Sequence, residues 1–157
     1  MSELTHIDAH GNARMVAVSD KPITRREAVA EGFIRMNEEA LQKVVERTAG
    51  KGDVLAVAQL AGIGGAKQTG TLIPLCHPVP LSAVSVELET REGGVYCRAM
   101  VRAEWRTGVE MEALTAVSTA LLTVYDMLKA VDRGMTLGPV QLIEKRGGRS
   151  GEWVRSE

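Results

Sequence analysis

Apolar and polar positions alternate most clearly between residues 81 and 106. Val84, Val86 and Leu88 share one face of the first half, and "REGG" at 91–94 supplies a turn. In the second half one face carries only apolar side chains: Val95, Cys97, Ala99, Val101, Ala103 and Trp105. A period of two over this length predicts an antiparallel hairpin with one face on the core. Cys97 on that face is expected to be a small, inert core residue.

Helical spacing predicts two helices before this hairpin. In "NEEALQKVVERTAG", Asn37 is a plausible N-cap and Gly50 ends the helix. A second helix is expected from Asp53 through "DVLAVAQLAGIGGAK". Each of its three glycines costs about 1 kcal/mol relative to alanine. Their presence indicates that another backbone or a ligand comes close to this helix.

The remaining pattern completes an α+β order of elements. "RMVAVS" at 14–19 alternates like a strand, whereas "ITRREAVAEGFIRM" at 23–36 is ambiguous between strand and helix. The longest helix is expected from Val109 to Arg133, followed by a strand, "GPVQLIEK". This order predicts an α+β, ferredoxin-like antiparallel sheet with helices packed on one face.

The longest helix has an unusually neutral second face. No charge occurs from Ala113 to Tyr125. Opposite the core stripe of this helix lie Thr115, Thr119, Leu122, Asp126 and Lys129. Asp126 and Lys129 are either a solvated i,i+3 salt bridge at a helix end, or a pair at the edge of an interface that covers the neutral face. On the second interpretation we expect a homo-oligomer.

Size and composition favour one soluble domain. The 157 residues are 45% hydrophobic and 25% charged, with a formal net charge of −1. We expect a single domain over 1–157 with flexible segments at 1–12 and 147–157. The net charge argues against a nucleic-acid partner. No apolar run approaches the roughly 18 residues of a membrane span, and two cysteines make no disulfide framework, so a cytoplasmic protein without a membrane partner is expected.

"TLIPLCHPVPL" at 71–81 places Cys76 beside His77 between prolines. Adjacent residues do not easily close a zinc site, and a CxxC, HxxxH or HExxH partner is absent, so no metal is expected. A catalytic Cys–His pair usually meets across the fold, which favours packing for Cys76. "GIGGAKQTG" matches neither nucleotide-loop pattern, since Lys67 lies between Ala66 and Gln68.

Several lysines occupy unusual places. Lys51 lies between two glycines, Lys67 closes a glycine-rich helix, Lys129 ends the neutral face, and Lys145 precedes "RGGRSG". Each is either a solvated surface lysine or, together with His77, part of a pocket for a polyanion.

Four long segments resemble one protein family. They are "KGDVLAVAQLAGIGGAK", "LIPLCHPVPL", "TGVEMEALTAVSTALLTVYDMLKAVDRGM" and "IEKRGGRSG". They resemble the cyclic pyranopterin monophosphate synthases, also called molybdenum cofactor biosynthesis protein C, and the resemblance covers nearly the whole chain. It implies a lyase that converts 3′,8-cyclo-7,8-dihydroguanosine 5′-triphosphate to cyclic pyranopterin monophosphate and releases diphosphate. It also implies a hexamer built as a trimer of dimers, with the active site at a subunit interface.

The resemblance also implies site residues. Asp126 and Lys129 would be the catalytic pair, and no cofactor or metal would be needed. The implied substrate contacts are Leu75, Cys76, His77, Met111, Glu112, Arg26, Lys51, Lys67 and Lys145. The chain departs from the family pattern at Gly64–Gly65, Gln68, Arg146 and Arg149, which affects the expected phosphate contacts. The alternative function is a non-catalytic oligomeric module that binds a nucleotide or pterin, and turnover distinguishes the two.

Overall fold

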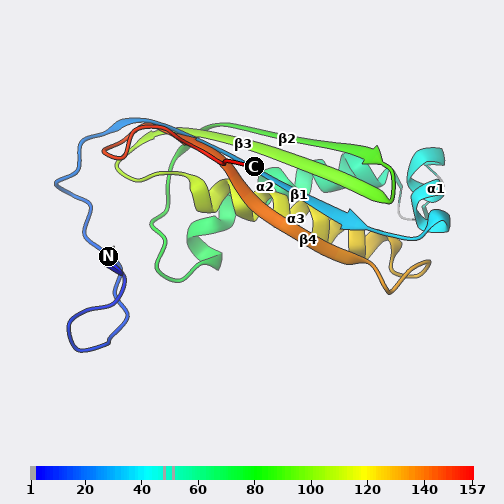
Figure 1. The fold of residues 1–157 in the computed structure, drawn as a ribbon, viewed down its shortest axis with the longest axis horizontal. Coiled ribbons are helices and arrows are strands. Elements are labelled where there is room, and N and C mark those ends of the chain that lie inside the picture. The colour runs from blue at the N-terminus through cyan, green and yellow to red at the C-terminus, as the bar shows by residue number, and fades with distance from the viewer. Residues whose placement is uncertain (1–2, 48, 51) are drawn as a thin grey trace.

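The computed structural model describes residues 3–47, 49–50 and 52–157 (Figure 1). In chain order these residues form β1 (Thr24–Arg35), α1 (Glu38–Glu46), α2 (Val54–Leu72), β2 (Leu81–Arg91), β3 (Gly94–Trp105), α3 (Glu110–Leu128), β4 (Thr136–Arg146) and β5 (Trp153–Val154). The predicted α+β class is confirmed. The ambiguous segment at 23–36 forms a strand, β1.

A five-stranded antiparallel sheet carries the fold, with strand order β2-β3-β1-β4-β5. Helices α2 and α3 lie against one face of the sheet, and α1 lies at one end (Figure 1). The loop between α2 and β2 and the N-terminal segment lie at the opposite end (Figure 1). The molecule is therefore a two-layer structure with different segments at its two ends.

The predicted hairpin is confirmed in its pairing and in its buried face. Leu88 pairs with Cys97 in the register between β2 and β3. The inward positions of β3 from Val95 to Ala103 are 0% exposed. Burial raises the pKa of the Cys97 thiol to about 12, so this cysteine is an inert core residue, as predicted.

Helix α1 begins as predicted but ends earlier. The side chain of Asn37 accepts a hydrogen bond from the Ala40 backbone N–H at 2.8 Å, as an N-cap does. The predicted end at Gly50 is wrong. Arg47 already adopts the left-handed conformation, with φ of 57°, and its N–H caps the carbonyls of Lys43 and Val44.

Helix α2 extends to Leu72, five residues beyond the predicted end, and two of its glycines, Gly62 and Gly65, face α3. A Cβ at Gly62 would lie 3.0 Å from the carbonyl oxygen of Ala116, and one at Gly65 would lie 2.5 Å from Oγ1 of Thr119. The predicted close approach of another backbone is therefore made by α3 of the same chain.

This packing changes the interpretation of the neutral face of α3. Thr115 and Thr119, which were expected beneath a second subunit, are partly buried against α2 instead. Farther along the same face Leu122 is 58% exposed. The chain thus covers the first half of the neutral face itself and leaves the second half open.

Helix α3 ends at Leu128, before the predicted Arg133. Asp132 accepts hydrogen bonds from the N–H groups of Asn37 and Gly134, each at 2.9 Å, which draws the chain out of the helix. By length and composition α3 could also span a membrane, but half of the relevant window is buried. Its contacts with α2 and the sheet are those of a core helix.

The strand predicted at 14–19 is wrong. Residues 14–18 are irregular and 19–20 form a turn. The alternation in "RMVAVS" is matched by burial, since Val16 and Val18 are half-buried and Met15 is 53% exposed, but the segment pairs with no strand of the described chain. Alternation alone does not make a strand when no neighbouring strand supplies hydrogen bonds.

Candidate active site

A small cavity of about 190 Å³ lies where the α2–β2 loop meets the start of α3. It brings together five of the expected substrate contacts. Its lining comprises His6, Leu75, Cys76, His77, Val79, Thr107, Gly108, Glu110, Met111 and Glu112. The sequence analysis missed His6, because no local pattern shows that the N-terminal segment folds back to this loop.

The loop that carries His77 is held against the end of α2. The Cys76 N–H donates a hydrogen bond to the Ile73 carbonyl at 3.1 Å. A Cβ at Gly70 would lie 3.0 Å from Cα of Pro78, so the loop packs directly on the helix. The prolines limit the loop to extended conformations, and the glycine lets it lie close.

Glu112 is the buried acid of this small cavity, with 4% of its surface exposed. Burial, and to a lesser extent the charge of Glu110, raises the pKa of Glu112 from near 4.5 to about 7. Burial, followed by the charge of Glu112, also raises the pKa of the Cys76 thiol. Near neutral pH Glu112 can therefore give or take a proton, whereas Cys76 stays a thiol, in keeping with a packing role.

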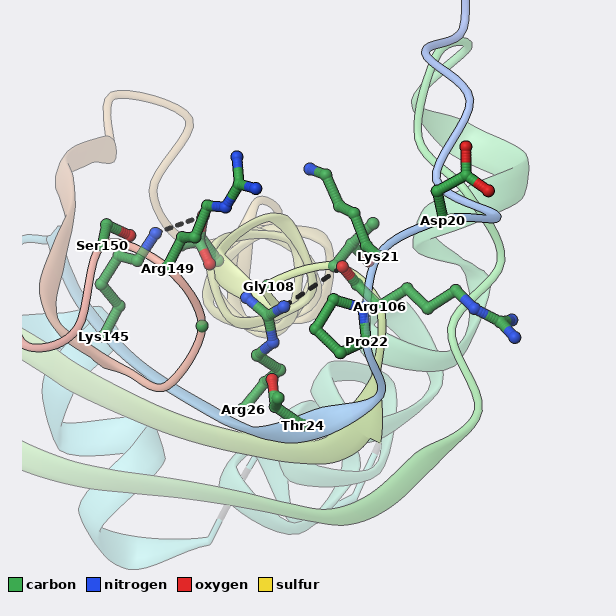
Figure 2. Close-up of a pocket in the computed structure, with 13 residues that line it drawn as sticks. Asp20, Lys21, Pro22, Thr24, Arg26, Arg106, Gly108, Lys145, Arg149 and Ser150 are labelled. Carbon is green, nitrogen blue, oxygen red and sulfur yellow. Dashed lines mark hydrogen bonds and ion pairs between the residues drawn. The ribbon is translucent and has the colours of Figure 1, made fainter.

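A larger cavity of about 720 Å³ adjoins the first and is basic (Figure 2). Arg26 of β1 and Lys145 of β4, both expected substrate contacts, line it together with Lys21 and Arg149. Figure 2 shows Arg26 between Lys21 on one side and Lys145 and Arg149 on the other. The complete lining is Asp20, Lys21, Pro22, Thr24, Arg26, Arg106, Thr107, Gly108, Glu110, Lys145, Gly148, Arg149 and Ser150.

Arg26 forms the floor of this basic cavity and is fixed by the backbone around it. One of its terminal nitrogens donates to the Arg106 carbonyl at 3.2 Å, and the Arg106 side chain points away (Figure 2). Gly148 has a φ of 80°, a conformation that favours glycine, and a Cβ there would require the Arg26 guanidinium to move. Nε of Arg26 and Oγ1 of Thr24 are buried without a hydrogen-bond partner in the described structure. Buried polar atoms of this kind are normally satisfied, and because neither atom is accessible to solvent, a ligand would reach them only if the floor rearranged.

The two cavities share part of their lining. Thr107, Gly108 and Glu110 border both. The two cavities therefore adjoin at these three residues. The basic cavity suits phosphates, and the small cavity offers apolar side chains with a histidine and a carboxyl.

Asp126 and Lys129 lie elsewhere in the chain. Nζ of Lys129 is 2.8 Å from a carboxylate oxygen of Asp126, and each side chain is more than half exposed. The hydrogen bond to Asp126 and the charge of its carboxylate raise the pKa of Lys129. In the single chain the effect of burial on the pKa of Lys129 is outweighed by that of Asp126, because little of the described chain covers the lysine.

The remaining expected contacts are Lys67 and Lys51. Lys67 is exposed on α2 and does not line either cavity, and Lys51 lies outside the described residues. The single chain thus brings together seven of the expected site residues in two adjoining cavities, and leaves Asp126, Lys129 and Lys67 apart from them.

Comparison with known proteins gives a consistent result over the whole chain. The model of the MoaC family matches residues 15–148. A cyclic pyranopterin monophosphate synthase from Thermomicrobium roseum is 60% identical and aligns over 100% of this chain and 96% of its own length. Proteins of the same name from Novosphingobium aromaticivorans and Brucella ovis are 54% and 55% identical, with coverage of 95% or more of each chain.

Proposed function

The chain belongs to the MoaC family, and from that premise we propose that its two adjoining cavities form one part of a substrate site completed by a second copy. The chain is a lyase of molybdenum cofactor biosynthesis: it converts 3′,8-cyclo-7,8-dihydroguanosine 5′-triphosphate to cyclic pyranopterin monophosphate and releases diphosphate. Identity over the full length carries this assignment. The proposal concerns which residues bind the substrate and where the protons move.

The basic cavity binds the triphosphate end of the substrate. Arg26, Lys145, Lys21 and Arg149 supply the positive charge that binds the phosphates. Negative charge grows on the diphosphate as it leaves. Cations that are already in place stabilise that charge more than they stabilise the bound substrate. Arg149 is a departure from the family pattern and takes part here as a phosphate contact.

The small cavity binds the ring system. Leu75 and Met111 offer apolar contact, and Cys76 contributes packing and backbone. His77 and Glu112 hydrogen-bond the polar edge of the rings. Since the pKa of Glu112 lies at about 7, it accepts from ring N–H groups when ionised and donates when protonated.

Asp126 and Lys129 supply the proton transfers, and they reach the cavities from a second copy of the chain. Their pair is exposed in the single chain, next to the open apolar side chain of Leu122. On α2, Val57, Leu60 and Leu72 are also exposed. A second copy that covers these side chains would desolvate Lys129 and make its proton easier to transfer. Lys51 and Lys67 are expected to join the site in the same way.

The assembly is a homo-oligomer, with the trimer of dimers implied by the family resemblance as its expected form. Its subunit is ferredoxin-like: β1, α2, β2, β3, α3 and β4 follow the β-α-β-β-α-β order with strands arranged β2-β3-β1-β4. A cytoplasmic location stays a prediction. Analytical ultracentrifugation at micromolar concentration is expected to show the oligomer, and monomer alone would end this part of the proposal.

Turnover tests the reaction and the roles of the pair. With the cyclic intermediate supplied, phosphorus NMR is expected to show diphosphate, and with GTP alone it is not. Asp126→Asn and Lys129→Met are each expected to abolish most of that signal while leaving the fold intact. If both variants keep wild-type turnover, the catalytic assignment is wrong. If the wild-type protein binds the intermediate without product, the chain is the non-catalytic module.

A further inference from the structure

Glu110 borders both cavities, and none of the roles assigned above uses it. One of its carboxylate oxygens lies 3.6 Å from Nζ of Lys145. Both side chains are mostly buried, with 31% of Glu110 and 24% of Lys145 exposed. This ion pair therefore lies inside the basic cavity, where the phosphates are proposed to bind.

The backbone is shaped to hold the carboxylate in this place. Glu110 is the first residue of α3, where the helix dipole favours a negative charge. A Cβ at Gly108 would overlap the other carboxylate oxygen of Glu110, so the carboxylate lies directly against the backbone of Gly108. It is thus packed between Gly108 and Lys145, and its side chain can still move away when another anion binds Lys145.

A carboxylate in an anion cavity has a cost for binding. It repels the incoming phosphates, and it occupies a cation that they would otherwise contact. A phosphate oxygen that approaches Lys145 must compete with Glu110. The lysine, in turn, keeps a partner when the cavity is empty, so its charge is not left partly buried and unpaired.

We propose that Glu110 is a resident counter-ion of the phosphate cavity: it pairs with Lys145 when the cavity is empty, is displaced from Lys145 by phosphate, and returns when diphosphate leaves. This inference rests on the proposed function, in which the basic cavity holds the phosphates. Its consequence is that Glu110 weakens the binding of diphosphate and speeds its release. Removal of the charge should therefore tighten product binding, which is the opposite of what removal of an ordinary binding residue does.

Equilibrium binding of inorganic diphosphate to the full chain tests the sign of this effect. Isothermal titration calorimetry at fixed pH and ionic strength is expected to give a Kd about five-fold lower for Glu110→Gln than for wild type, the size expected of one partly buried ion pair. Glu89→Gln is the matched control. It makes the same charge change and breaks a pair with Arg91 at the far end of β2, and it should leave Kd unchanged.

Lys145→Met as a second background separates competition for Lys145 from other effects of Glu110→Gln. In Lys145→Met the gain from Glu110→Gln should shrink, because the cation that both anions seek is gone and only the repulsion between Glu110 and phosphate remains. Equal or weaker diphosphate binding by Glu110→Gln, with wild-type binding measurable, would overturn the counter-ion role alone. If wild type turns over substrate but shows no diphosphate binding, the assignment of the basic cavity fails, and this inference fails with it.

Discussion

Glu112 and Asp126 lie near opposite ends of α3, separated by about 21 Å along the helix axis at 1.5 Å per residue. Groups that move protons on one substrate must come within about 3 Å of it. One chain cannot bring both carboxyl groups to the same reacting atoms. Because the proposed reaction needs the cavity beside Glu112 and the pair at Asp126, each site requires two copies of the chain.

Glu112 makes the free energy of unfolding depend on pH. Its pKa is raised in the folded protein from near 4.5 to about 7, so the fold favours its protonated form. The stabilising contribution is fully present below pH 4.5 and is lost as pH rises through about 7. The loss reaches about 3 kcal/mol above that value. Glu112→Gln cannot ionise, so between pH 4.5 and 8 it should gain about 3 kcal/mol of stability relative to wild type.

Urea denaturation at both pH values measures this difference, at one fixed protein concentration because the chain is expected to associate. Glu89→Gln, an exposed acid, should show no such change. A Glu112→Gln variant whose stability relative to wild type is the same at pH 4.5 and 8 would contradict the burial of an uncompensated carboxyl.

His6 is expected to contact the ring system, since it lines the small cavity beside His77. His6→Ala should raise KM about five- to ten-fold, the size of one lost hydrogen bond to substrate, with a smaller change in kcat. His10 lies in the same N-terminal segment, where its backbone N–H donates to the Asp8 carboxylate at 2.9 Å, but it does not line the cavity. Steady-state kinetics of His10→Ala should match wild type, and an equal loss in both variants would mean that this segment acts only as a scaffold.

Gly65 tests the contact between α2 and α3. A Cβ there would lie 2.5 Å from Oγ1 of Thr119, so Gly65→Ala should lower stability by about 1–2 kcal/mol despite the helix propensity of alanine. Thr119→Ala removes that oxygen and should restore part of the loss in the double variant. Thermal unfolding of Gly65→Ala, Thr119→Ala and the double variant measures these changes in stability. A higher Tm for Gly65→Ala alone would show that the helices are farther apart.

The sequence was sufficient for features that local pattern determines. Neighbouring residues determine the alternation in the hairpin, its antiparallel pairing and the Asn37 cap. The structure contains all of these features. Helix ends were less predictable. Arg47 ends α1 in a conformation that glycine usually adopts, and Asp132 ends α3 through a bond to Asn37, 95 residues away. Such ends depend on partners that no local window contains.

The site residues likewise divide into those that local motifs indicate and those that they do not. The motifs located Leu75 to His77 and Met111 to Glu112, which the fold brings into one cavity. They did not indicate His6, Lys21 or Glu110, whose positions depend on how loops from distant parts of the chain meet. The neutral face of α3 suggested a partner subunit, but half of this face packs on α2 of the same chain. Composition shows that a face must be covered, and it does not identify the element that covers it.

Complementation between two inactive variants tests the shared site most directly. His77→Ala damages the half of the site that the small cavity forms, and Asp126→Asn damages the half that the Asp126–Lys129 pair forms. In a mixed dimer, one site receives both lesions and the other receives none. Co-expression with different tags, followed by purification through both tags, should therefore recover diphosphate release, at up to half the wild-type rate when every dimer is mixed. Mixed oligomers, verified by native mass spectrometry, that stay as inactive as the single variants would contradict a site built from two chains.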